Sequence, residues 1–169
     1  MSNYRRFTRE CNLEQLRPEL LLALREYLLG HGLADIEAQI VMCCETMSER
    51  HKTSFLASLL GEDLDEKYYT GAFFTPHMLV WVRSGDKTGA AVVSAQLREI
   101  RVRPFAAPLV NDAGLEVIGY VGDSNARVRG YIGLGTELAA RRFCEAVKQA
   151  VDKVNPPRNF LDIFRYTPR

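Results

Sequence analysis

Apolar residues at helical spacing predict two amphipathic helices, one near each end of the chain. The first spans residues 18–29, where Pro18 suits a first helical position and Gly30 provides a stop. Its apolar stripe consists of Leu20, Leu21, Leu24, Tyr27 and Leu28. The second spans residues 137–154, with Thr136 as the expected N-terminal cap and the sequence NPP after its end. We expect both stripes to pack against the rest of the protein.

Between these helices, short runs rich in β-branched and aromatic residues alternate with turn residues. They predict strands at 68–75, 78–84, 88–94, 99–104, 115–121 and 127–134. Because links this short cannot carry the crossovers that parallel strands need, the sheet is expected to be antiparallel. One face of the hairpin TGAFFTPHMLVWVRSGDKTGAAVV, residues 70–93, should point inward, with the side chains of Ala72, Phe74, Leu79 and Trp81.

Residues 35–47 fit two periodicities, and spacing alone leaves both open. A helix face would collect Ile36, Ile40, Cys43, Cys44 and Met47, whereas one side of a strand would collect Ile36, Ala38, Ile40, Met42 and Cys44. In a strand, Cys43 and Cys44 would point to opposite faces, so at most one of them would be buried. The mostly polar residues 48–67 are expected to form a long connection.

The order of elements, antiparallel strands followed by one amphipathic helix, predicts an α+β fold whose bent sheet is plugged by the C-terminal helix. In this layout the chain resembles bacterial pleckstrin-homology-like domains, which are related to GRAM domains. The residues that fill the family's hairpin pattern are Gly71, Phe73, Phe74, Thr75, Leu79 and Trp81. The resemblance extends over residues 36–154. The chain departs from the pattern at Met78, where an arginine is typical, and at Phe143, since the last helix has no tryptophan.

The resemblance implies a pleckstrin-homology-like antiparallel β-barrel over residues 34–155, closed by the C-terminal helix and with 35–47 as its first strand. Residues 1–33 would then be an N-terminal helical extension, and residues 156–169 a C-terminal tail. Because such domains bind phosphoinositides, peptides or proteins and are rarely catalytic, the resemblance implies a non-catalytic binding module. We expect its partner to be another protein or a second copy of the chain. Anionic phospholipid head groups are the alternative ligand, and an enzyme with an unrecognised site is a further alternative.

Composition narrows these expectations. The 169 residues include 22 Lys and Arg against 21 Asp and Glu, so the overall charge does not call for a nucleic-acid partner. No apolar stretch approaches the roughly 18 residues of a membrane-spanning helix. The polar, basic start lacks the apolar core of a signal peptide, which predicts a cytoplasmic protein.

The cysteines are expected to be reduced, buried thiols, because their spacing is not that of a secreted disulfide framework: Cys11, Cys43, Cys44 and Cys144.

The sequence offers no catalytic, metal or cofactor site. The histidines are scattered, without the spacing of a metal site, at His31, His51 and His77. The stretch RVRGYIGLGTELA, residues 127–139, resembles the turn of a dinucleotide site. It has Leu138 where a third small residue should stand, and only a short tail follows the predicted helix. We therefore expect Gly133 and Gly135 to allow close strand-to-helix packing, and no cofactor.

Arginine placement is the one pattern that points to a ligand. Arg101 and Arg103 share a strand face by the period of two, and so do Arg127 and Arg129 on another strand. If the two faces adjoin, they form a cationic patch that could hold phosphate head groups or an acidic peptide through forked hydrogen bonds. The alternative is a solvent-facing surface balanced by nearby acids: Glu99, Glu116 and Asp123.

Overall fold

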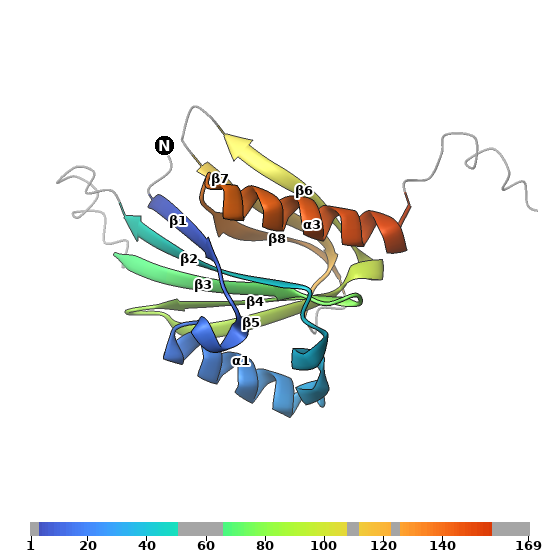
Figure 1. The fold of residues 1–169 in the computed structure, drawn as a ribbon, viewed down its shortest axis with the longest axis horizontal. Coiled ribbons are helices and arrows are strands. Elements are labelled where there is room, and N and C mark those ends of the chain that lie inside the picture. The colour runs from blue at the N-terminus through green and yellow to red at the C-terminus, as the bar shows by residue number, and fades with distance from the viewer. Residues whose placement is uncertain (1–3, 51–65, 108–111, 123–125, 157–169) are drawn as a thin grey trace, which may run out of the picture.

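The computed structural model describes residues 4–50, 66–107, 112–122 and 126–156 (Figure 1). Their strands are β1 (Tyr4–Glu10), β2 (Met42–Arg50), β3 (Lys67–Phe74), β4 (Met78–Gly85), β5 (Gly89–Gln96), β6 (Ile100–Ala107), β7 (Asp112–Tyr120) and β8 (Arg127–Leu134). Their helices are α1 (Pro18–Gly30) and α3 (Leu138–Val154), with short 3₁₀ helices η1 (Leu13–Gln15), η2 (Ala34–Gln39) and η3 (Leu97–Glu99). These elements confirm the predicted hairpins and both predicted amphipathic helices.

The strands form two antiparallel sheets in chain order, β1 to β5 and β6 to β8. The expected α+β class, the antiparallel pairing and the C-terminal helix are therefore confirmed. The expected closed barrel is wrong, because no ladder joins the two sheets within the described ranges. At one contact between the two sheets, side-chain hydrogen bonds replace a backbone ladder. Thr8 Oγ1 accepts from the Gly135 amide at 2.7 Å, and Glu137 Oε2 accepts from the Thr8 amide at 3.1 Å.

Helix α3 packs against the inner faces of both sheets, as the layers in Figure 1 show. Phe143 and Val147 are fully buried there. The predicted inward residues Ala72, Phe74, Leu79 and Trp81 all belong to this core. The other sheet contributes Leu115, Val117, Ile132 and Leu134. The long amphipathic stripe predicted over 137–154 thus fills the space between the layers.

Helix α1 lies on the opposite face of the five-stranded sheet (Figure 1). Its buried leucines Leu20, Leu24 and Leu28 share a second core with Cys43, Phe73, Val80 and Val82. Both faces of the central strands are therefore covered. Cys43 is 2% exposed and Cys44 is 0% exposed, so the expectation that at most one is buried is wrong. All four cysteines are free and buried, as expected.

Three segments and one helix cap differ from the sequence-based expectations. The chain forms the 3₁₀ helix η2 where residues 35–47 were expected to start a strand, and β2 begins only at Met42. Strand β1 was not predicted, because its sequence YRRFTRE has no apolar alternation. The expected connection over 48–67 overlaps the ends of β2 and β3, and residues 51–65 lie outside the described ranges. The N-terminal cap of α3 is Glu137 and not Thr136.

Asn155 ties the end of α3 to the corner between the two sheets. Its side-chain Nδ2 donates to the carbonyl oxygens of Leu97, Arg98 and Ile100, at 3.0, 2.7 and 3.1 Å. These carbonyls belong to η3 and the first residue of β6, where the chain leaves the five-stranded sheet. One amide group therefore binds three backbone carbonyls of this corner.

Candidate binding face

The outer face of the three-stranded sheet collects all four arginines singled out from the sequence. Strand alternation turns Leu115, Val117 and Ile132 inward to α3, so the residues between them face outward. The register places Arg101 opposite Ile118, and Ile118 opposite Arg129. The next row contains Arg103, Glu116 and Tyr131, and Arg127 lies opposite Tyr120. We call Arg101, Arg103, Arg127, Arg129 and Glu116 the arginine face.

Glu116 lies between two of the arginines and holds both. The Nε of Arg103 donates to its Oε2, and the Nε of Arg129 lies 3.0 Å from its Oε1. The Glu116 side chain is only 8% exposed, whereas Arg103 is 62% and Arg129 is 69% exposed. One carboxylate can neutralise only one of the two guanidinium groups. A net positive charge and several N–H donors therefore remain directed to solvent.

The ionised forms of Glu116 and Arg103 favour each other. The hydrogen bond from Arg103, and then the charges of Arg103 and Arg129, hold the pKa of Glu116 below its ordinary value of 4.5. The same hydrogen bond raises the pKa of Arg103. Glu116 and Arg103 are therefore both charged at neutral pH. The carboxylate fixes the two guanidinium groups in place, so a ligand that meets them does not have to order both long side chains.

The other two arginines are placed differently. Arg101 Nη1 donates to the carbonyl oxygen of Asn155 at 3.0 Å, beyond the C-terminal end of α3. A cation at this position is favoured by the negative end of the helix dipole, so Arg101 has a structural role. Arg127 is exposed at the start of β8, beside Tyr120 in the register. The structure therefore brings Arg103 and Arg129 together, with Arg127 and Arg101 at the margins.

Aromatic rings accompany the arginines on the same face, and sequence reasoning missed them. Phe105, Tyr120 and Tyr131 are all exposed. The rings of Phe105 and Tyr131 meet edge to face with centroids 5.5 Å apart, and the Tyr131 hydroxyl donates to the Ala113 carbonyl at 2.8 Å. Phe105 follows Arg103 by two residues, and Tyr131 follows Arg129 by two. Both aromatic residues could have been predicted by continuing the alternation one step beyond Arg103 and one step beyond Arg129.

Two glycines make room beside these rings. Gly114 and Gly133 face each other in the register. A Cβ at Gly114 would lie 2.8 Å from the Tyr131 hydroxyl, and one at Gly133 would lie 2.6 Å from Nε of Arg6 in β1. Gly133 therefore admits an arginine from the other sheet and does not serve the strand-to-helix packing expected of it. Gly135 does lie at the start of α3, against the carboxylate of Glu137.

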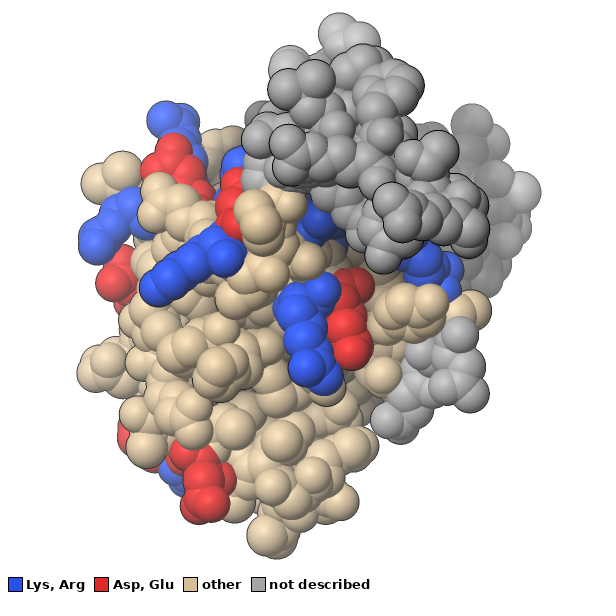
Figure 2. Space-filling model, turned by 90° about the vertical axis from the view of Figure 1, so that its right-hand side faces the viewer, with Lys and Arg blue, Asp and Glu red and all other residues tan. Residues whose placement is uncertain are grey.

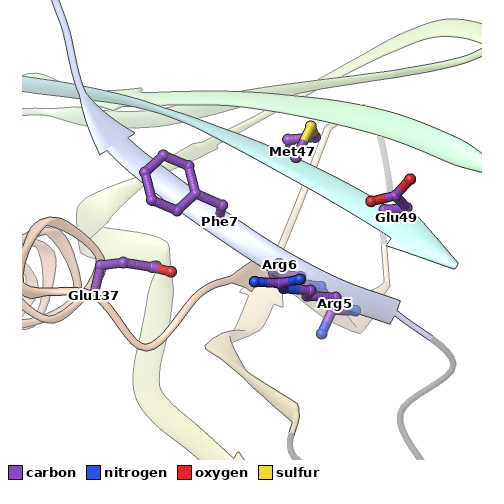
Figure 3. A pocket seen from close by; sticks show the side chains of 6 residues that line it. All are labelled: Arg5, Arg6, Phe7, Met47, Glu49 and Glu137. Atoms are coloured by element: carbon purple, nitrogen blue, oxygen red, sulfur yellow. The ribbon is translucent and has the colours of Figure 1, made fainter. Parts of the chain in front are cut away.

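A pocket of about 340 Å³ at the β1 edge is the other candidate (Figure 3). It is lined by Arg5, Arg6, Phe7, Met47, Glu49 and Glu137. The lining contains two guanidinium groups and two carboxylates, so it favours neither an anionic nor a cationic ligand. Glu137 is also engaged in accepting the Thr8 amide. The pocket is therefore a weaker candidate than the arginine face.

Charge elsewhere is mixed. On the side of the molecule drawn in Figure 2, cationic and anionic side chains lie next to one another, and the lower half is mostly uncharged. Among the described residues, no three His, Cys, Asp or Glu side chains gather as a metal site would require. No helix in the described ranges combines the length and apolar character needed to span a membrane.

Comparison with known proteins adds no family to this description: no family model matches the chain, and no curated protein or solved structure matches it. The chemistry of the arginine face is therefore the basis for assigning a function.

Proposed function

We propose that the protein is a non-catalytic binding module whose arginine face binds an acidic segment of a partner protein. The observation that carries the proposal is four arginines on one sheet face with, in the described part of the chain, a single carboxylate in register among them. Asp123, another acid expected near these strands, lies outside the described residues. Guanidinium groups stay protonated at all physiological pH values and match carboxylates through paired N–H donors. The held pair Arg103 and Arg129 is the centre of the proposed site.

The chemistry of the face supports binding in preference to catalysis. A general acid or base must exchange a proton near neutral pH, which arginine does not do. Glu116, whose pKa is lowered by Arg103, is held ionised and covered by the two arginines. The neighbouring rings of Tyr120, Tyr131 and Phe105 favour a protein partner, because tyrosine and arginine are enriched in protein interfaces.

The proposal includes a pleckstrin-homology-like architecture in a cytoplasmic protein. Its support is the order of elements, in which an antiparallel meander precedes a three-stranded sheet and one amphipathic helix follows at the carboxyl end. Residues 34–155 would form this domain. The free, buried state of all four cysteines agrees with a reducing compartment.

Titration of a fluorescent oligoglutamate peptide with the full chain tests the proposal. We expect saturable binding that weakens as salt is added, because exposed charge contacts are screened. Arg129→Glu should weaken binding by about tenfold or more, since it reverses one charge of the central pair. Arg5→Glu makes the same charge change on the other sheet and should leave binding near the wild-type value. Equal binding by both variants, or no binding by the wild type, would overturn the proposal.

Anionic phospholipid head groups are the second candidate, favoured by the exposed aromatic rings beside the arginines. Tyrosine and arginine suit the head-group layer, because their apolar parts can be covered while their polar ends stay hydrated. Co-sedimentation with phosphatidylserine vesicles separates this candidate from the first. Salt-sensitive sedimentation that Arg129→Glu abolishes, without oligoglutamate binding, would favour the lipid ligand. Sedimentation that is absent or indifferent to salt would exclude it.

A further inference from the structure

The edges of the two sheets differ in how they are protected from pairing with another chain. An open strand edge presents backbone donors and acceptors, which charged residues, prolines or covering segments usually guard. Strand β1 carries Arg5, Arg6 and Arg9, and its Thr8 amide is bound by Glu137. Strand β6 carries Pro104 between Arg103 and Phe105. Strand β8 carries Arg127 and Arg129.

Over residues 89–93, strand β5 has none of these guards among the residues that the structure describes. It is the outermost strand of its sheet beyond β4, with the sequence GAAVVSAQ, which contains no charged residue and no proline. Gly89, Ala90 and Ala91 are exposed. An uncharged edge of small residues is the kind that readily accepts another strand.

The hydrogen bonds of β5 identify which backbone groups face outward. The Ser94 carbonyl accepts from the Gly122 amide at 2.7 Å, on the side away from β4. Since outward and inward residues alternate in an antiparallel strand, Ala90 and Val92 also direct their N–H and C=O groups outward. No described residue forms a hydrogen bond with these outward groups of Ala90 and Val92.

We propose that β5 pairs antiparallel with β5 of a second copy of the chain, joining the two five-stranded sheets across a two-fold axis. With the axis at Ala91, Ala90 lies opposite Val92 of the partner subunit. All outward donors and acceptors of both residues are then used. The Ser94 carbonyl stays with Gly122, so the pairing stops where the chain already occupies the edge.

A second copy fits this edge for two reasons. The strand is uncharged, so two identical edges meet without like-charge repulsion, which would oppose pairing of β1, β6 or β8 with themselves. The exposed side chains beside the proposed axis are Ala90 and Ala91, which leave room for close approach of two backbones. Identical strands related by a two-fold axis are also self-complementary by symmetry.

Sedimentation velocity of the full chain under reducing conditions tests the pairing. We expect the mass to rise with protein concentration toward twice 19.1 kDa. Ala90→Pro should give a monomer, because it removes an outward N–H and leaves the ladder to β4 intact. Ala90→Thr keeps that N–H and is the matched control, which should still dimerise. Circular dichroism melting checks that both variants are folded.

A crosslink makes the test independent of the proline variant. Ala91 would face Ala91 of the partner subunit as a non-hydrogen-bonded pair, with Cα atoms about 4.5 Å apart, within disulfide range. In Ala91→Cys, two thiols should react with oxidised glutathione to give one intersubunit disulfide and two molecules of reduced glutathione. Glu145→Cys, exposed on α3, is the control and should remain largely uncrosslinked.

Three results would overturn the proposal. They are a wild type that stays monomeric at its highest soluble concentration, a dimer that Ala90→Pro leaves intact, and crosslinking of Ala91→Cys no faster than of Glu145→Cys. The inference does not rest on the proposed function. Arg129→Glu, which should weaken ligand binding at the arginine face, should leave the dimer unchanged, so failures of the two proposals are distinguishable.

Discussion

The two sheets of this protein are built from the same antiparallel pairing but differ in how many faces the helices cover. The five-stranded sheet lies between α1 and α3, so adjacent residues such as Cys43 and Cys44 are both buried. The three-stranded sheet has α3 on one face, and its strands alternate between core residues and arginines. Coverage thus determines the sequence pattern: continuous apolar runs where two helices pack, and alternation where one does.

The difference in helix coverage also separates the residues that stabilise the fold from the residues that are free to bind a ligand. A face covered by a helix offers its side chains only to the core, whereas the uncovered face can hold charged groups without the penalty of removing them from water. Residues of the arginine face can therefore be changed with little effect on the free energy of unfolding. Substitutions on matched faces of the two sheets test this division directly.

The largest effect is expected for Phe73→Ala, under α1 on the five-stranded sheet. Phe73 is fully buried, so truncation removes its contacts and leaves a cavity. We expect the free energy of unfolding to fall by about 3–5 kcal/mol. Urea denaturation followed by tryptophan fluorescence measures the change, because Trp81 lies in the other core of the same sheet.

Phe105→Ala is the matched control on the uncovered face. It removes the same side chain and its edge contact with Tyr131, so the loss should be less than about 1.5 kcal/mol. Equal losses for the two variants would contradict the division between a covered and an uncovered outer face.

An intermediate effect is expected for Cys43→Ser and Cys44→Ser. Each places a hydroxyl in an apolar core, one beneath α1 and one beneath α3, so each should lower the free energy of unfolding by about 1–3 kcal/mol. Ala38→Ser, at an exposed position of η2, should change it by less than about 0.5 kcal/mol. A neutral result at either cysteine would show that one face of the sheet is open to water.

The smallest effect concerns pH and Glu116. Because Arg103 and Arg129 hold the pKa of this carboxyl below 4.5, its ionised form stabilises the folded state. That contribution is present above pH 4.5 and is lost as the pH falls through the lower, folded-state pKa. Glu116→Gln should therefore be less stable than the wild type at pH 7, and the difference should shrink in acid. Urea denaturation at several pH values measures it.

Glu145→Gln is the control for this prediction, since Glu145 is exposed on α3. Its difference from the wild type should show no comparable decline in acid. If the Glu116→Gln difference instead stays constant from pH 7 to acid, the ion pairs of the arginine face do not contribute to folding.

Much of the architecture could be predicted from local signals. Turn residues in TPH and SGDKTG delimit β3, β4 and β5, and the apolar stripes of α1 and α3 follow helical spacing. Strand β1 could not, because its partner is β2, more than 30 residues away, and its own residues are mostly polar. The burial of both Cys43 and Cys44 was missed for a related reason: it depends on where α1 docks, which periodicity does not specify.

The candidate site was predicted in part. The period of two places Arg101 with Arg103 and Arg127 with Arg129 on common faces. That the two pairs share one sheet face, with Glu116 between Arg103 and Arg129, depends on the register of β7 against both neighbours. Register arises from tertiary packing and the lengths of the connections, so sequence reasoning could name Glu116 as a counter-charge but could not place it at the centre.

The hydrogen bonds of Asn155 bear on the order in which the protein is assembled during translation. The ribosome adds this residue after all eight described strands, yet its amide secures the corner where β5 leads into β6. A nascent chain can pair β1 to β5 and dock α1 early, as amino-terminal parts do. Mutual docking of the two layers has to wait until synthesis has passed residue 155.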